Sequence, residues 1–268
     1  MSETGTDDAN CGTTHYTACR RLDRAAVSAS PGDVLRLDPA SVPYRLPCFL
    51  SDSDPDEKFT LRSLTVVAAD SSGRPAIGCD ATTNRCALGL VNATMIGVDL
   101  EVDKCHVTIF DSRLFDSTVY TTRTCRSLRM RVTRTNWTFS GYLPCSRVAP
   151  RGNVTEPCRE TLSNRLWCES TDITLDRVRL VLGSFVIKSR YSTHIYVAES
   201  QFTGDPDVPE NQFLGGLHMT FSAIGANITV VNCVFSNQAS TSTACVEKPL
   251  FLNFRLLDFS LSSFIVQS

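Results

Sequence analysis

The sequence predicts an all-β chain wound as a parallel β-helix, a solenoid with one capping helix at its N-terminal end and disulfide-tied loop inserts. One eight-residue pattern of apolar positions recurs along the chain, mostly at intervals close to one turn of such a solenoid. Convincing helical periodicity occurs only once, and the remaining segments are short and divided by Gly, Pro, Asp and Ser. Twelve cysteines, an even number, lie largely in turn-like sequence.

The predicted helix spans residues 16–29. Cys19, Leu22, Ala26 and Ala29 fall on one of its faces, and Pro31-Gly32 ends it. Residues 33–37 then alternate as a strand. We expect the helix to cover the first coil, because an unpaired strand edge there would otherwise promote aggregation.

The recurring pattern reads apolar, any, apolar, any, any, small, any, apolar. Its copies begin 14, 23, 43, 22, 33 and 24 residues apart. Values of 22 to 24 correspond to one coil, 43 and 33 to one coil with an insertion, and 14 indicates that the first copy lies on another face. The copies are Ala93-x-Met95-x-x-Val98-x-Leu100, Val107-x-Ile109-x-x-Ser112-x-Leu114, Met130-x-Val132-x-x-Thr135-x-Trp137, Ile173-x-Leu175-x-x-Val178-x-Leu180, Ile195-x-Val197-x-x-Ser200-x-Phe202, Ile228-x-Val230-x-x-Cys233-x-Phe235 and Leu252-x-Phe254-x-x-Leu257-x-Phe259.

Each copy places two residues of a strand inward, turns a corner, and then places a small and a large residue inward on the next face. A single coil cannot bury its inner face, so neighbouring coils must stack to close the core. The third position of the later copies therefore predicts one interior column. Its members are Ile109, Val132, Leu175, Val197, Val230 and Phe254.

The start of the chain resembles the entry to right-handed parallel β-helix proteins of the pectate-lyase-like superfamily. The residues that carry this likeness follow the helix: Ser30-Pro31-Gly32-Asp33-Val34-Leu35-Arg36-Leu37, Tyr44, Leu64-Thr65-Val66-Val67 and Pro75-Ala76-Ile77-Gly78-Cys79. With the repeated coils it covers nearly the whole chain, although Ser41-Val42-Pro43-Tyr44 replaces the expected Gly-x-Tyr. The alternative fold is a pair of disulfide-bonded β-sandwiches, which would lack the 22-residue period.

One domain is expected over residues 11–268, with residues 1–10 outside the fold and an inserted loop at 141–170. Apolar residues make up 42% and charged residues 20%, which excludes wholesale disorder. No stretch approaches the roughly 20 apolar residues of a membrane-spanning helix. The chain ends inside an apolar, strand-like run, so we expect a fragment of a longer protein and membrane attachment only through a further segment.

The cysteines favour disulfides and an oxidising compartment, the alternative being buried free thiols. The insert holds three of them, and one of these is expected to pair outside it, with Cys125 as the candidate. The predicted disulfide cysteines are Cys11, Cys19, Cys48, Cys79, Cys86, Cys105, Cys125, Cys145, Cys158, Cys168, Cys233 and Cys245.

Four N-x-[ST] sequons indicate N-glycosylation at Asn92, Asn136, Asn153 and Asn227. In the repeat, Asn92, Asn136 and Asn227 flank inward positions and so point outward, and Asn153 falls in the insert. We therefore expect a secreted or cell-surface glycoprotein, such as a receptor ectodomain.

Charge is unevenly distributed along the chain. The formal net charge of −2 excludes a globally basic nucleic-acid binder, but residues 120–190 carry a local charge of +8. At the fifth position of the repeat, Asp111, Arg134, Arg177 and Glu199 would form an acid–Arg–Arg–acid ladder on adjacent coils. Its simplest interpretation is a screened surface ladder of little energetic value.

Arginine forks also favour carboxylate, sulfate or phosphate ligands. We therefore predict an extracellular protein or anionic glycan as the partner and no nucleic acid. Binding is expected at the insert 141–170 and at the arginines beside it. The predicted partner-binding residues are Arg123, Arg126, Arg129, Arg131, Arg134, Arg147, Arg151, Arg177 and Arg179.

The resemblance raises the possibility of an enzyme, since the superfamily contains pectate lyases and polygalacturonases. Their Asp clusters with Ca²⁺ and an Arg base, and their Asn-x-Asp, Asp-Asp, Gly-His-Gly and Arg-x-Lys motifs, are missing, and Gly215-Gly216-Leu217-His218 is the nearest match. No strand is expected to carry paired carboxylates on one face, as glycoside hydrolysis requires. Asp172 and Asp176 come closest, but they straddle a corner.

The other polar candidates have simpler explanations. His15, His106, His194 and His218 are isolated, and the middle two are expected to point outward. The acidic run at residues 51–57, and the group of Asp205, Asp207 and Glu210, fit solvated turns better than a Ca²⁺ site. We thus predict no catalytic residue, metal or cofactor. The alternatives are a polysaccharide lyase or hydrolase with an unrecognised site, and a purely structural rod.

Overall fold

The described residues of the computed structural model are 1–2, 5, 11–12, 18–40, 42–46, 59–69, 74–79, 86–102, 105–122, 125–140, 143–144, 159–160, 163–203, 216–221, 226–236, 242–245, 251–259 and 264–267. Strands predominate in this part of the chain, and nearly all of their pairings are parallel. No helix in it is long and apolar enough to cross a membrane.

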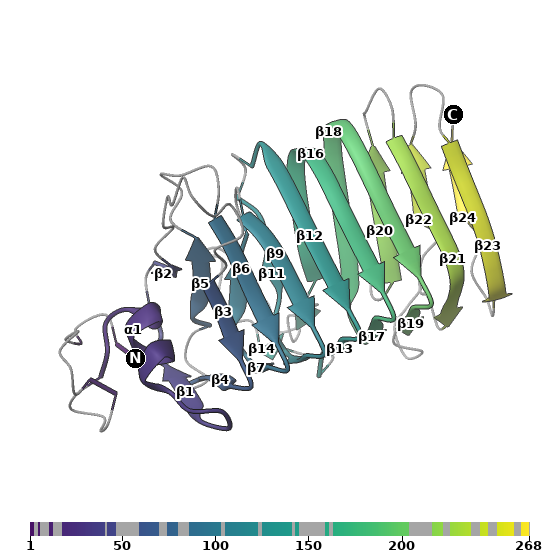
Figure 1. Cartoon of the computed structure of the whole chain (residues 1–268). Coiled ribbons are helices and arrows are strands. Elements are labelled where there is room, and N and C mark those ends of the chain that lie inside the picture. Colours follow the sequence, from purple (N-terminus) through teal and green to yellow (C-terminus); the bar gives the residue numbers. More distant parts are fainter. Residues whose placement is uncertain are drawn as a thin grey trace, which may run out of the picture.

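The strands form three parallel stacks, and the chain passes through the first, second and third stack before it returns to the first (Figure 1). The first stack contains β3 (Phe59–Arg62), β6 (Cys86–Val91), β9 (Cys105–Phe110), β12 (Ser127–Thr133), the second halves of β16 (Ser163–Asp176) and β18 (Ser184–Ala198), β21 (Ala226–Ser236) and β23 (Phe251–Phe259). The second stack contains β1 (Val34–Leu37), β4 (Thr65–Ala68), β7 (Thr94–Ile96), β10 (Arg113–Phe115), β13 (Asn136–Thr138), β17 (Arg179–Val181) and β19 (Gln201–Thr203). The last residues of β21 and β23 continue this second stack.

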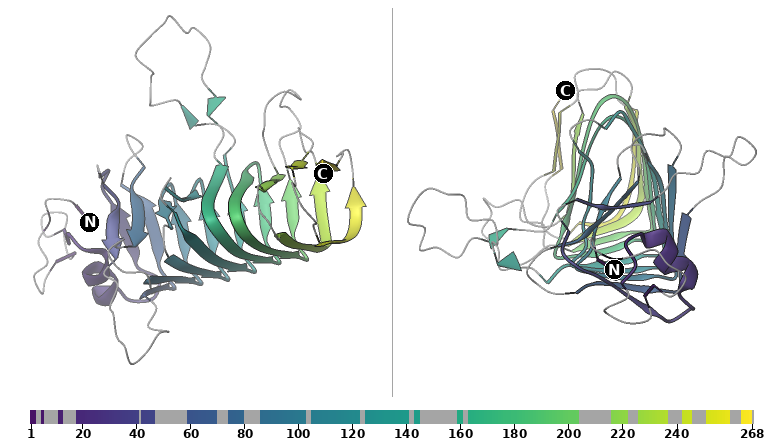
Figure 2. Two further views of the ribbon diagram at one scale, coloured as in Figure 1. Left: turned by 90° about the horizontal axis from the view of Figure 1, so that it is seen from above. Right: turned by 90° about the vertical axis from the view of Figure 1, so that its left-hand side faces the viewer.

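The third stack contains β2 (Tyr44–Leu46), β5 (Ala76–Cys79), β8 (Asp99–Glu101), β11 (Val119–Tyr120), the first halves of β16 and β18, and β20 (Gly216–Phe221). Two small sheets are not hydrogen-bonded to these stacks: the antiparallel pair β14 (Leu143–Pro144) and β15 (Arg159–Glu160), and the parallel pair β22 (Ser242–Cys245) and β24 (Phe264–Gln267). Figure 2 shows the stacked coils enclosing a common interior. The architecture is consistent with a parallel β-helix, and the alternative of two β-sandwiches, which are antiparallel, is wrong.

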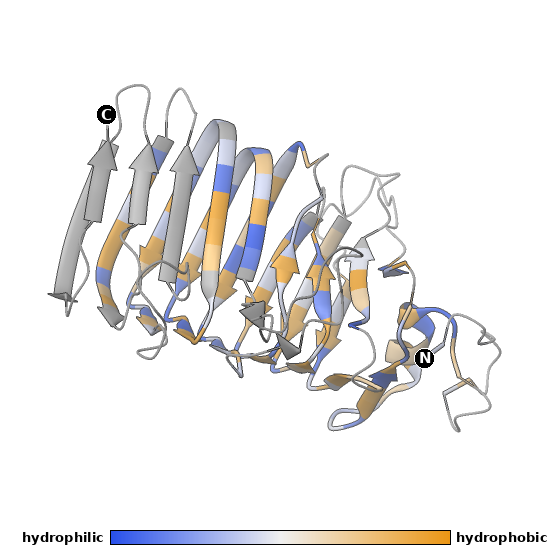
Figure 3. Cartoon of the chain, turned by 180° about the vertical axis from the view of Figure 1, so that it is seen from behind, coloured by the Kyte–Doolittle hydropathy of each residue, from blue (hydrophilic) through white to orange (hydrophobic). Residues whose placement is uncertain are grey.

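The core runs along this interior, and polar and apolar residues alternate along the strands around it (Figure 3). The predicted interior column is confirmed in its register, because its members are aligned on successive strands of the first stack. The five members whose side chains are described, Ile109 to Val230, are at most 1% exposed.

A left-handed residue turns the chain between the first and second stacks, and we call this turn the first corner. Seven non-glycine residues there have φ between 47° and 53°, and they include the fifth position of the repeat: Ser63, Asn92, Asp111, Arg134, Arg177, Glu199 and Asn232. The small inward residue that follows the corner, at the sixth position of the repeat, forms hydrogen bonds to the backbone. Ser200 Oγ donates to the Ala198 carbonyl (2.7 Å) and accepts from the Val178 N–H (3.0 Å), which explains why this inward position is small and often hydroxylated.

The second corner, between the second and third stacks, lies five residues after the first in each of three coils, at Gly97, Asp116 and Leu182, all with positive φ. The pattern copy that starts at Ala93 spans this second corner, as its 14-residue spacing indicated. The copies aligned at the first corner are instead Leu88-x-Leu90-x-x-Ala93-x-Met95 and Phe59-x-Leu61-x-x-Leu64-x-Val66. Leu88 precedes Val107 by only 19 residues, so coil length varies between the third stack and the first.

The N-terminal helix is shorter than predicted. α1 spans Leu22–Ser28 and lies at the N-terminal end of the stacks (Figures 1 and 2). Arg21, the residue before the helix, has extended backbone, and Cys19 is bonded to Cys11 in the segment that precedes it. The fully buried Leu22 packs in the main core beneath it.

Two of the predicted disulfides are confirmed, Cys11–Cys19 and Cys125–Cys168. The second one ties the start of β12 to β16 on the next coil, at the base of the insert. Cys233 contradicts the prediction, because it is a buried free thiol at the small inward position, 3.3 Å from the Val231 carbonyl. Burial raises the pKa of this thiol. The side chains of the other predicted disulfide cysteines lie outside the described residues: Cys48, Cys79, Cys86, Cys105, Cys145, Cys158 and Cys245.

Candidate functional site

Five arginines gather along the first corner on three consecutive coils, and we call this group the arginine edge. Each lies within three residues of the corner, on β10, β12, β17 or at the corner itself. The left-handed corner projects two of them, and the strand alternation turns the other three outward. The members are Arg113, Arg131, Arg134, Arg177 and Arg179, all exposed.

The predicted ladder forms as two ion pairs between coils. Arg134 Nη2 lies 2.5 Å from Asp111 Oδ2, and Arg177 Nε lies 4.0 Å from Glu199 Oε2. Arg177 also binds its neighbour Asp176 at 3.0 Å. The hydrogen bond and charge of Asp176, followed by Glu199 and Asp111, raise the pKa of Arg177, so its charge persists. All these groups are in contact with water, which screens such pairs, so they contribute little to the stability of the fold.

The other three arginines of the edge form no ion pair with any described residue. Arg113 and Arg179 both point outward from the second stack, and Asn136 lies between them in register. Two steps of about 4.8 Å therefore separate their backbones. Arg131 extends from the first stack, between Thr108 and Thr174. These guanidinium groups are available to a ligand.

The remaining predicted arginines have other positions. Arg129 pairs with Asp172 at 3.2 Å, and Arg126 is exposed at the far end of β12, away from the corner. Arg123, Arg147 and Arg151 lie outside the described residues, as does most of the insert 141–170. Arg113 was missed by the sequence prediction, although its place two residues after a corner acid is a usable signal.

The sequon prediction is confirmed in orientation, because Asn92, Asn136 and Asn227 are all exposed. Asn92 occupies the first corner and donates from Nδ2 to Ser63 Oγ at 3.3 Å. Asn136 lies inside the arginine edge. Asn153 falls outside the described residues.

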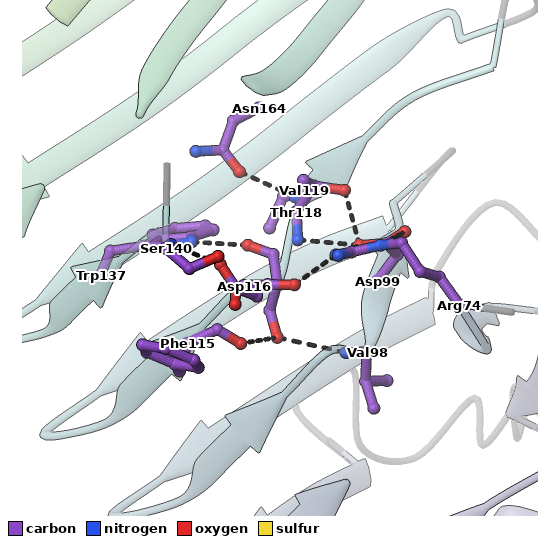
Figure 4. Close-up of polar contacts among 11 residues, drawn as sticks. Arg74, Val98, Asp99, Phe115, Asp116, Thr118, Val119, Trp137, Ser140 and Asn164 are labelled. Carbon is purple, nitrogen blue, oxygen red and sulfur yellow. Dashed lines mark hydrogen bonds and ion pairs between the residues drawn. The ribbon is translucent and has the colours of Figure 1, made fainter. Parts of the chain in front are cut away.

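A second polar cluster lies at the second corner (Figure 4). Both nitrogens of the Arg74 fork bind Asp99, at 2.5 and 3.0 Å, and Nη2 also donates to the Asp116 carbonyl. Asp99 Oδ1 further accepts from the N–H and Oγ1 of Thr118, at 2.9 and 2.7 Å. The cluster thus fills the hydrogen-bonding positions of the carboxylate.

The corner beneath this cluster is fixed from inside the core. Trp137 is fully buried, and its Nε1 donates to the Ser117 carbonyl at 2.6 Å. Its ring meets Phe185 edge to face, with centroids 5.1 Å apart. Asp116 Oδ1 accepts from the Ser140 N–H at 2.6 Å, which joins this corner to the next coil.

Glu101, two residues after Asp99, is held in a similar way. Arg45 Nη1 approaches it to 2.6 Å by crossing Gly78, where a Cβ atom would lie 2.7 Å from that nitrogen. Tyr120 donates to it at 3.2 Å. Burial, and then the charge of Glu101, raise the pKa of Tyr120 well above its ordinary value, so the phenol stays neutral.

The expectation that no strand carries paired carboxylates on one face is therefore wrong, since Asp99 and Glu101 share the outer face of β8. The Asp-x-Glu spacing indicates two carboxylates on one face of a strand. The repeated pattern did not reveal this strand, because most copies of the pattern cover only the first and second stacks. Both carboxylates are bound by a guanidinium and a further donor.

The other polar candidates show no grouping among the described residues. His106 and His194 are exposed, as predicted. Across the described ranges, no three His, Cys, Asp or Glu side chains are placed to hold a metal ion. Residues 51–57, Asp205, Asp207, Glu210, His15 and the side chain of His218 lie outside the described part.

No protein-family model matches the chain, and no curated protein or solved structure is significantly similar to it.

Proposed function

We propose that the chain is a non-enzymatic, secreted or cell-surface glycoprotein domain whose arginine edge binds an anionic glycan. One observation carries the proposal: Arg113, Arg131 and Arg179 are exposed and without ion pairs among the described residues, on three successive coils. An unpaired arginine on each coil forms a line of positive charge along the solenoid. An extended polyanion matches this line better than a compact ligand does.

The chemistry of binding follows from the guanidinium group. Its planar fork binds sulfate or carboxylate through two parallel hydrogen bonds, so each free arginine can hold one anionic group. Arg134 and Arg177 add charge, but their neighbouring acids offset most of it. Affinity should therefore depend mainly on the three unpaired arginines and fall with ionic strength.

The fold and the compartment form part of the proposal. Right-handed crossovers are the rule between parallel strands, which supports a right-handed β-helix with pectate-lyase-like architecture. Disulfides such as Cys125–Cys168 are typical of oxidising compartments. This bond fixes the base of the insert 141–170, which we propose as a second contact for the partner.

Heparin affinity chromatography tests the proposal. The chain is made in an oxidising host that adds no N-glycans and is eluted with a salt gradient. The triple variant R113S/R131S/R179S should elute at lower salt than the unmodified chain, because three anion contacts are lost.

The matched control is R24S/R36S/R62S, which removes three exposed arginines near the N-terminal end. It should elute close to the unmodified chain. If both triple variants elute at equally reduced salt, binding depends on net charge alone, and the proposal of a specific arginine edge is wrong. Flow-through of the unmodified chain at low salt would contradict the proposal.

A polysaccharide hydrolase or lyase is the second candidate, and the Asp99–Glu101 pair is the observation that favours it. Each carboxylate is already bound by an arginine, so we expect no turnover of pectate, hyaluronan or alginate, with or without Ca²⁺. Assays for unsaturated products and reducing ends test this. Turnover that D99N or E101Q abolishes in a folded protein would replace the binding proposal with an enzyme.

A further inference from the structure

The sequon at Asn136 lies between the two unpaired arginines of the second stack. On β13, Asn136 is aligned with Arg113 on β10 and with Arg179 on β17. Adjacent strands lie about 4.8 Å apart, so the asparagine and both arginines leave the surface side by side. All three side chains are exposed. A glycan on Asn136 would therefore emerge between the two cationic groups.

The next outward positions add an apolar surface for the first sugar. Phe115 is aligned with Thr138, the hydroxyl residue of the sequon, and lies diagonally from Asn136. Phe115 is 43% exposed, and Ile96 beside it on the preceding coil is 40% exposed. The C–H face of a pyranose packs against such a ring. Contact with Phe115 would hold the glycan down on the second stack.

We infer that N-glycosylation of Asn136 opposes polyanion binding at the arginine edge. This inference rests on the proposed function. A branched glycan that starts between Arg113 and Arg179 fills the space through which a polyanion must reach both guanidinium groups. Arg131, on the first stack, stays accessible but supplies one contact alone. Glycosylation thus divides the protein into a weakly binding and a more tightly binding form.

The test compares forms of the full chain made in a secretory host. Peptide mass analysis measures occupancy at Asn136, and heparin elution is recorded for wild type, N136Q and T138A. T138A removes the sequon but keeps the asparagine, which guards against an effect of N136Q on folding. N227Q is the matched control, because Asn227 is an exposed sequon on β21, distant from the edge.

N136Q and T138A should both elute at higher salt than wild type, with about tenfold higher affinity for heparin. N227Q should match wild type. An unoccupied Asn136, or equal elution of N136Q and an occupied wild type, would overturn the inference. Failure of the proposed function is recognised separately, because the glycan-free chain would then not bind heparin at all.

Discussion

The two corners of the coil use the same chemical pair in different surroundings. At the first corner, Arg134 and Asp111 are 45% and 40% exposed, and at the second, Arg74 and Asp99 are 24% and 16% exposed. Both pairs have N···O distances of 2.5 Å and join neighbouring coils. At the second corner, however, Thr118 also donates twice to the carboxylate.

If the proposed function holds, this difference places stability at the second corner and binding at the first. Water screens the pair at the first corner, so it contributes little to folding but leaves its guanidinium within reach of a ligand. The pair at the second corner is partly desolvated and saturated with donors, so losing one partner would leave the other uncompensated. Under the proposed function, one side of the solenoid serves recognition and the adjacent side holds the coils together.

The largest expected effect comes from the core beneath the second corner. Trp137→Ala should lower the free energy of unfolding by about 3–5 kcal/mol, since it removes a fully buried ring. Trp137→Phe keeps most of the ring but loses the hydrogen bond to Ser117, and should cost clearly less. Urea unfolding of both variants measures this. An alanine variant as stable as wild type would place this corner outside the cooperative core.

An intermediate effect separates the two corners directly. Asp99→Asn should destabilise by roughly 2 kcal/mol, because it leaves Arg74 partly buried without its counter-charge. The matched variant Asp111→Asn should cost under about 1 kcal/mol and raise heparin affinity, because it releases Arg134. Denaturant unfolding and salt-gradient elution measure both variants. Equal destabilisation by the two would contradict the division between the corners.

The smallest expected effect depends on pH. Tyr120→Phe should cost about 1 kcal/mol at pH 7, where it loses the bond to Glu101. The pKa of Tyr120 is raised in the folded state, so its stabilising contribution is present below the ordinary tyrosine pKa and declines as pH rises above about 10. The difference in free energy of unfolding between wild type and Tyr120→Phe should therefore become smaller in unfolding experiments at alkaline pH. A difference that stays constant from pH 7 to 10.5 would contradict this prediction.

The interior column was predictable because inward residues must repeat wherever coils stack. Val132 and Leu175 align although 43 residues separate them, because the intervening insert leaves the stack. The ladder was predictable for the same reason, since corner residues share one register. Orientation of Asn136 also followed from the alternation along its strand.

Other features depended on contacts that the pattern does not encode. The pairing of Asp99 with Arg74 requires the register of the third stack, where the spacing between coils is irregular. Cys233 looked like a disulfide partner by composition, but its inward position demands a small buried side chain. The helix was overestimated because the apolar periodicity of residues 16–29 does not reveal that the backbone is extended at Arg21.

The constant five-residue step between the two corners has a practical consequence. The first and second corners are five residues apart at Asn92 and Gly97, at Asp111 and Asp116, and at Arg177 and Leu182, so the second stack keeps one length. The return path, which runs from the second corner through the third stack to the first, varies in length. Added length on the return path is therefore not transmitted to the next coil. Protein engineers can treat that path as a display position, where grafted peptides of different sizes project from a scaffold whose spacing they leave unchanged.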